Sequence, residues 1–278
     1  MKNCLLRRSP QTVLAALLIL GEWAADSQSF GPYLVNRTFA LPSFALGDLA
    51  YANGFLYSSD YGHAYIHKLD SSTGQVLQDW APFGTIQQLS TGLAWDGINL
   101  WMVNRDEKRI YKLILPATGR GSVASSFVVP TSPGLTGWVM DLTYANGYFY
   151  YPEYQGPIHK IDAATGVQAG TIPSPSGTVY GLTFDGQNLL ASEGNGVFPN
   201  DTLWVISPQD GTVLDTWQTG VSGMVGLAYD LTTHSLYMGN YTTVTVAQLV
   251  PEPSSQAIFA ALFLSLVCFS GFQLRRQL

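Results

Sequence analysis

Short runs of alternating apolar and polar residues, separated by glycine, asparagine and aspartate, fill the middle of this 278-residue chain. Alternation with a period of two predicts β-strands that bury one face. Asn-Gly and Asp-Gly pairs favour the tight turns of β-hairpins, and they occur at Asn53-Gly54, Asp96-Gly97, Asn146-Gly147 and Asp185-Gly186. The pattern therefore predicts an all-β protein built from hairpins.

Five segments with this pattern align as an internal repeat. Each has a leucine in its first strand and an aromatic residue two positions later, and successive leucines are 44, 49, 40 and 45 residues apart. The leucines are Leu49, Leu93, Leu142, Leu182 and Leu227, and the aromatic residues are Tyr51, Trp95, Tyr144, Phe184 and Tyr229. Repeats of this length with four short antiparallel strands predict a five-bladed β-propeller.

The fifth repeat is incomplete, because the chain has no fourth strand after residues 243–249. An unpaired strand edge loses hydrogen bonds and invites aggregation. Residues 34–42, before the first repeat, have the pattern of a fourth strand, with Phe39 at the position that Phe127 takes in the second repeat. We therefore expect this N-terminal strand to close the ring, so that the propeller spans residues 34–249.

The repeats resemble those of known propeller families. The unit GLAWDGINLWMVNRDEKRIYKLILPATG, residues 92–119, is similar to units of the NHL, SMP-30 and glutamine-cyclotransferase-type propellers. The shared Gly-Leu-Ala-aromatic-Asp-Gly motif is typical of a blade and marks no functional site. The resemblance therefore implies a fold, and a fold alone does not imply an activity.

The N-terminal segment has the order of a secretory signal peptide. Lys2, Arg7 and Arg8 precede a short apolar run at residues 12–21, which small residues follow. We expect cleavage near residue 27, so that residues 1–27 are absent from the mature protein. An uncleaved membrane anchor is the alternative, although the apolar run is short for a bilayer span.

Residues 250–278 have three parts: the triplet Pro251-Glu252-Pro253, an uncharged apolar stretch at 257–274, and the pair Arg275-Arg276. The stretch has about the length of a short transmembrane helix, and the arginines favour the cytoplasmic side. Together the parts resemble the PEP-CTERM sorting signal of Gram-negative bacteria that make extracellular polysaccharide or biofilm. The resemblance implies transient anchoring in the inner membrane, processing by exosortase, and final placement in the envelope or matrix. A plain membrane anchor is the alternative.

Charge and cysteine content exclude several functions. Between residues 26 and 250 the chain has 8 basic and 17 acidic residues, so its surface should repel the phosphates of nucleic acids. Both cysteines, Cys4 and Cys268, lie in the terminal segments. The propeller can therefore hold no disulfide, no cysteine-bound zinc and no cysteine nucleophile.

Carboxylates recur at two repeat positions that should share one face of the propeller, since one hairpin joins the start of the first strand to the end of the second. Asp48 and Asp141 precede the repeated leucine, and Asp60, Glu153 and Glu193 end the second strand. Their oxygens suit a hard cation such as Ca²⁺. SMP-30-like lactonases, which the repeats resemble, hold a metal at the channel mouth. Alternatively, these side chains satisfy backbone groups in turns.

The sequence contains no Gly-x-Ser-x-Gly elbow, no His-Glu-x-x-His motif and no phosphate-binding glycine loop. His67 and His159 share one repeat position, which should place them in different blades. These features favour an exported, non-catalytic propeller that binds a partner in the cell envelope or the polysaccharide matrix. A metal-dependent hydrolase of the lactonase type is the alternative.

Overall fold

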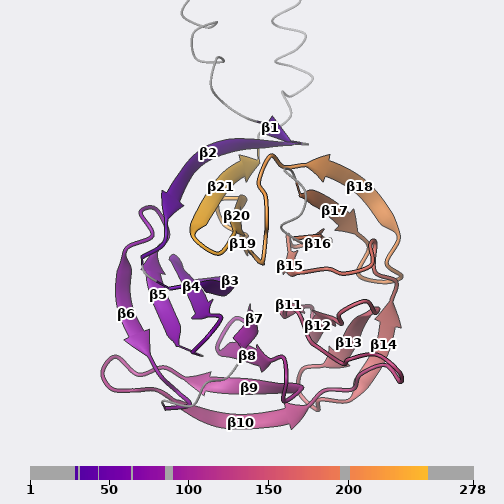
Figure 1. Ribbon diagram of the computed structural model, residues 1–278, viewed down its shortest axis with the longest axis horizontal. Coiled ribbons are helices and arrows are strands. Elements are labelled where there is room, and N and C mark those ends of the chain that lie inside the picture. The colour runs from indigo at the N-terminus through magenta and orange to yellow at the C-terminus, as the bar shows by residue number, and fades with distance from the viewer. Residues whose placement is uncertain are drawn as a thin grey trace, which may run out of the picture.

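The computed structural model describes residues 29–30, 32–42, 44–63, 65–84, 90–194 and 201–249. The predicted signal peptide and sorting tail lie outside these ranges. The described residues form strands β1 to β21, arranged as five sheets around a central axis (Figure 1). None of the elements in these ranges is a helix that could cross a bilayer.

Four of the sheets are blades of four antiparallel strands in chain order, with the first strand of each nearest the axis (Figure 1). The first blade contains β3 (Leu46–Ala52), β4 (Phe55–Asp60), β5 (Ile66–Asp70) and β6 (Val76–Trp80). The second contains β7 (Ser90–Trp95), β8 (Leu100–Asn104), β9 (Arg109–Ile114) and β10 (Ser122–Val128). The third contains β11 (Thr143–Ala145), β12 (Tyr148–Pro152), β13 (Ile158–Asp162) and β14 (Gln168–Ile172). The fourth contains β15 (Gly181–Phe184), β16 (Leu189–Ser192), β17 (Thr202–Ile206) and β18 (Val213–Gln218).

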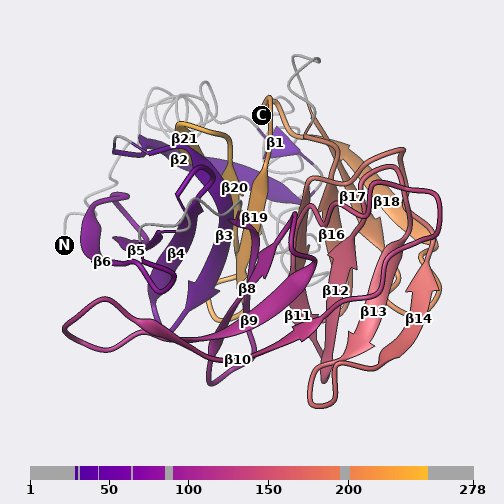
Figure 2. The same cartoon turned by 60° about the horizontal axis from the view of Figure 1, so that its bottom comes forward.

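The fifth blade combines the two ends of the propeller. It contains β19 (Gly226–Asp230), β20 (Ser235–Gly239) and β21 (Thr243–Leu249), and β2 (Tyr33–Ala40) supplies its fourth strand. β2 pairs antiparallel with β21 from Tyr33 opposite Leu249 to Ala40 opposite Thr243 (Figure 1, Figure 2). The five-bladed fold and its closure by the N-terminal strand are thus confirmed. The sequence did not predict β1 (Ser29–Phe30), which adds a short outermost strand to this sheet.

The hydrophobic core is divided among the interfaces between neighbouring blades. Five clusters of buried side chains are present, and each joins one blade to the next. The interface between the last and the first blade has the same character as the others, since Val225 and Tyr237 of the fifth blade pack with Leu46 and Leu56 of the first. Burial of apolar area between blades therefore holds the ring together all the way round.

A contact of the outer strands also repeats around the ring. Phe39 in β2 lies against Gly74 in the first blade, and Phe127 in β10 lies against Gly166 in the third. A Cβ atom on Gly74 would fall 2.3 Å from the Phe39 ring, and the Gly74 φ of +74° also disfavours other residues. The N-terminal strand therefore makes the contact with the next blade that an ordinary fourth strand makes.

We expect Phe39→Ala to lower the free energy of unfolding by about 2–3 kcal/mol, because a large, partly buried ring leaves the interface between the last and first blades. Leu34→Ala in the same strand is the control, since Leu34 is 37% exposed and its loss should cost less than about 0.5 kcal/mol. Urea unfolding of the propeller domain, residues 28–249, measures the free energy of unfolding of both variants. Equal midpoints for the two variants would contradict the role of β2 in closing the ring.

Candidate functional site: the axial carboxyl pair and the aromatic cup

Two of the five predicted metal-binding carboxylates meet near the propeller axis. Asp48 lies in β3 and Asp141 lies just before β11, and both are completely buried. Their carboxyl groups interact directly with each other, and each affects the pKa of the other. We call these two residues the axial carboxyl pair.

Backbone N–H groups from all five blades surround the axial carboxyl pair. The Leu93 N–H donates to Asp48 Oδ2 at 2.6 Å, with weaker contacts to that carboxyl from the N–H groups of Leu49 and Leu227. The N–H groups of Leu142 and Leu182 donate to the two oxygens of Asp141. These donors belong to the five repeated leucines. Two side chains therefore provide the hydrogen-bond acceptors for a backbone N–H group at the inner end of every blade.

Glycine occupies the same repeat position in the other three blades. A Cβ atom on Gly92 would lie 2.5 Å from the carbonyl carbon of Asp141, and one on Gly226 would lie 2.8 Å from Asp48 Oδ1. A Cβ atom on Gly181 would lie 2.6 Å from the Ser192 hydroxyl oxygen. The axis therefore has room for two side chains at this level, and the remaining three positions require glycine.

The axial carboxyl pair holds its protons more tightly than ordinary carboxyl groups do. Burial raises the pKa of Asp48 to about 8, although Asp141 and the surrounding N–H groups act in the opposite direction. Burial and the charge of Asp48 raise the pKa of Asp141 well above its ordinary range. Asp48 Oδ1 is the one carboxyl oxygen of the pair without a well-aligned N–H donor in the described structure. Asp48 Oδ1 is therefore the oxygen that is free to carry a proton shared by the two groups.

The other three predicted metal ligands lie elsewhere. Asp60 accepts from the Gly62 N–H at 3.0 Å and pairs with His63, as expected for turn chemistry. Glu153 is buried against His159, with Nε2 2.9 Å from Oε2, and it also accepts from the Ser132 N–H. Glu193 follows β16, and its own N–H donates to the carbonyl of Thr202 at 3.4 Å.

The five carboxylates therefore do not form one ligand set. Across the ranges that the structure describes, no group of three or more His, Cys, Asp or Glu side chains could hold a metal ion. At the axial carboxyl pair, the N–H donors occupy lone pairs that a cation would need. Calcium binding itself stays a prediction, without an assembled site to support it. His67 and His159 lie in separate blades, as expected, and His67 pairs with Asp79 at 2.7 Å.

A cavity lies on the same face as these predicted ligands. Its volume is about 280 Å³, and its lining includes the residues directly before the axial position of each blade. Six large side chains form its wall, and we call them the aromatic cup: Tyr61, Arg105, Trp138, Tyr154, Tyr180 and Tyr241. The cup opens to solvent, since Trp138 is 38% exposed and Tyr241 is 46% exposed.

Contacts between the cup residues hold their side chains in place. The rings of Trp138 and Tyr154 lie 5.5 Å apart, and those of Tyr61 and Tyr241 meet edge to face at 6.2 Å. The Arg105 guanidinium lies over the Trp138 ring at 4.7 Å, and its Nη1 donates to the Tyr61 hydroxyl at 3.1 Å. Burial, together with the nearby Tyr154, Tyr241 and Tyr61, raises the pKa of Tyr180. This hydroxyl therefore remains a neutral hydrogen-bonding group.

Most of the cup residues lie one position after the repeat position of the predicted metal ligands. The predicted ligands at the ends of the second strands bond to their own turns or are buried, whereas the next residue in four blades reaches the cavity. These next residues are Tyr61, Arg105, Tyr154 and Tyr241, and Gly194 takes their place in the fourth blade. Three tyrosines in one repeat column are visible in the sequence, so this signal was available.

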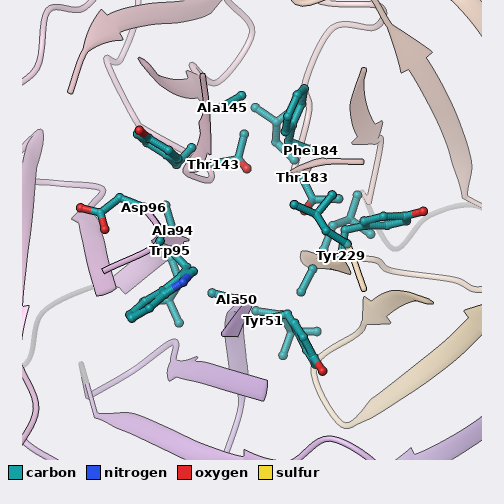
Figure 3. Close-up of a pocket in the computed structure, with 18 of the residues that line it drawn as sticks. Ala50, Tyr51, Ala94, Trp95, Asp96, Thr143, Ala145, Thr183, Phe184 and Tyr229 are labelled. Atoms are coloured by element: carbon teal, nitrogen blue, oxygen red, sulfur yellow. The ribbon is translucent and has the colours of Figure 1, made fainter. Parts of the chain in front are cut away.

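A second cavity opens at the other end of the axis. Its volume is about 390 Å³, and its lining includes Leu49, Leu93, Leu182 and Leu227. Aromatic side chains from several blades surround it, as Figure 3 shows for Tyr51, Trp95, Phe184 and Tyr229. The cup is lined by residues just before the axial position and this cavity by the leucines just after it. The axial carboxyl pair therefore separates two cavities.

Comparisons with known proteins identify the fold and nothing finer. No protein-family model and no curated protein matches the sequence. The structure is similar to the crystal structure of Myxococcus xanthus glutaminyl cyclase, with a TM-score of 0.63, 15% identity, and coverage of 78% of this chain and 97% of that chain. At an identity this low, the similarity establishes a common β-propeller fold and leaves the activity open.

Two further structures give weaker matches. The WD40 β-propeller domain of Doa1 matches with a TM-score of 0.47 and 13% identity, over 74% of this chain and 64% of that domain. Kuenenia stuttgartiensis hydrazine synthase matches with a TM-score of 0.44 and 14% identity, over 70% of this chain and 55% of that one.

The axial carboxyl pair should make stability depend on pH. A carboxyl with a raised pKa in the folded state stabilises the fold below its ordinary pKa, and this contribution is lost as the pH rises through about 8. We expect the wild-type melting temperature to fall as the pH rises from about 4 to about 8. In Asp48→Asn the fall should be smaller, because the amide donates to Asp141 as the shared proton does.

Asp141→Asn is the matched comparison. Both oxygens of Asp141 accept from N–H groups, so an amide nitrogen there must face a donor. This variant should lose about 1–3 kcal/mol at every pH, which is the range for a buried polar group left unpaired. Thermal melting across the pH series tests both variants, and an Asp48→Asn curve that parallels wild type would contradict the shared proton.

Proposed function

We propose that this protein is an exported binding protein of the cell envelope or extracellular matrix, which holds a polysaccharide in the aromatic cup. The aromatic cup is the observation that carries the proposal. Four tyrosines and a tryptophan from four different blades converge on one open cavity beside the axis. Aromatic side chains clustered at the surface favour ligand binding, because exposing their apolar area to water is unfavourable in free energy unless a partner covers it.

The shape and chemistry of the cup suit a sugar ring. One face of a pyranose carries mostly C–H groups, which pack on aromatic rings, while its edge carries hydroxyls. Tyrosine offers both an apolar ring and a hydroxyl that donates and accepts. The cavity of about 280 Å³ lies at the lower limit of ordinary ligand pockets, so it fits one or two sugar rings better than a large cofactor.

The lining supports binding rather than catalysis. Its described residues include no carboxylate and no histidine that could transfer a proton to or from a bound ligand. The nearest carboxyl groups at the axis are buried and bonded to backbone N–H groups. A lactonase of the SMP-30 type needs a metal ligand set, and a glutaminyl cyclase activity has only a distant fold similarity behind it.

Export and sorting rest on the terminal sequences. The basic and apolar order of residues 1–27 supports secretion, and the Pro-Glu-Pro triplet, apolar stretch and arginine pair of residues 250–278 support recognition by exosortase. Hosts with such signals make extracellular polysaccharide, which is the ligand class that the cup suits.

Replacing Pro251, Glu252 and Pro253 by alanine should leave export intact and stop processing, because the recognised triplet is lost while the apolar stretch remains. Mass spectrometry of the C-terminus, after expression in a native-type host with exosortase, measures this. A variant trimmed like wild type would remove the support for sorting.

Trp138→Ala should weaken binding to the host's purified extracellular polysaccharide about tenfold or more, since loss of one aromatic stacking surface costs roughly 1.4 kcal/mol. Trp95→Ala is the control, because it removes the same side chain from the opposite cavity. Isothermal titration calorimetry of both folded variants measures the effect. Binding that survives Trp138→Ala and disappears in Trp95→Ala would place the ligand in the other cavity and refute the proposal.

A further inference from the structure

Arg105 sets the charge of the aromatic cup. Of the described residues that line this cavity, Arg105 alone carries a full charge at neutral pH. The surrounding propeller is acidic, with 17 acidic and 8 basic residues between positions 26 and 250. A cationic group in the wall of a cavity attracts an anionic ligand to that cavity, whereas the rest of this acidic domain repels one.

Contacts fix the Arg105 guanidinium in one orientation. Nη1 donates to the Tyr61 hydroxyl, Nε donates to Asp106 at 3.0 Å, and the plane lies over the Trp138 ring. The Arg105 side chain is only 16% exposed, so little conformational freedom remains to be lost when a ligand binds. A guanidinium has five N–H donors, and three of those of Arg105 make no bond to the residues that the structure describes.

The neighbouring carboxylates leave those donors available. Asp106 is 51% exposed and engages only Nε. Asp60 is bonded to Gly62 and His63, and Glu153 is buried against His159. Within the described structure, no carboxylate bonds to the two Nη atoms of Arg105.

We infer that the cup selects acidic sugars, and that Arg105 binds the carboxylate of a uronic acid whose ring stacks on the tyrosines and Trp138. This inference rests on the proposed function. The planar guanidinium forms two parallel hydrogen bonds with a planar carboxylate, and the carboxylate of a uronate lies at the rim of the sugar ring. One ring can therefore stack on the aromatic wall and reach Arg105 at the same time.

Binding of each acidic sugar is compared with binding of its uncharged methyl ester. The probes are trisaccharides of glucuronate, galacturonate, mannuronate and guluronate, together with their methyl esters, which keep every ring and hydroxyl and lose the charge. By calorimetry, wild type should bind at least one acid about tenfold or more tighter than its ester, as expected for a charge-assisted pair. Arg105→Gln should bind that acid and its ester equally, at the affinity wild type shows for the ester.

Arg109→Gln is the matched control. It makes the same change of charge in the same blade, at a side chain that bonds to Ser126 on the outer strand and does not line the cup. This variant should keep the wild-type preference for the acid. Loss of the preference in Arg109→Gln as well would assign the selectivity to net charge and overturn the inference, and ester binding by Arg105→Gln shows that its cup is intact.

The outcomes separate the inference from the proposed function. If wild type binds an ester as tightly as its acid, the selection of acidic sugars is overturned while polysaccharide binding stands. Preference for a sulfated trisaccharide over all uronates would likewise overturn it. If wild type binds no probe and no host polysaccharide, the proposed function fails, and the inference fails with it.

Discussion

Satisfying five backbone N–H groups with two buried side chains is the constraint on which the centre of this propeller depends. Each blade brings the N–H of its repeated leucine to the axis, where the two carboxyl groups are buried from solvent. Two carboxyl groups have enough oxygens to accept from all of them, and the three glycines leave the space that the pair needs. Five aspartates would crowd and repel one another, whereas five glycines would leave every donor unpaired.

The same interaction shapes the two cavities of the molecule. Because the axial carboxyl pair fills the middle of the axis, the aromatic cup has a closed floor and does not continue into the apolar cavity beyond it. A ligand in the cup therefore approaches and leaves from one face. A polymer would contact the cup through an end or a protruding unit, and the rigid interfaces between blades hold the cup residues at fixed separations.

Much of the fold was predictable from the sequence, and the site was less so. The spacing of the leucines and the Asn-Gly and Asp-Gly turns predicted the blades, and the strand pattern around Phe39 predicted the closure. A repeat alignment shows which residues share a height along the axis, but not the direction of their side chains. For this reason the sequence groups Asp60 and Glu153 with Asp48 and Asp141 in one candidate metal site, and gives no weight to Tyr61 and Tyr154, one position later. The bonds of the axial carboxyl pair depend on distances between blades, which no local pattern contains.

The pairing of β2 with β21 joins the two ends of the propeller sequence. Tyr33 and Leu249, which lie opposite each other in the sheet, are nearly as far apart along the chain as two propeller residues can be. Four complete blades separate β2 from β21 in the sequence, so β2 can pair only when the last strand of the ring is available. The first four blades can form from local hairpins, because their strands follow one another in sequence. Closing this longest loop therefore has the greatest cost in loop entropy of any strand pairing in the ring. Until β2 and β21 pair, each of them has an unpaired strand edge, and such edges favour aggregation.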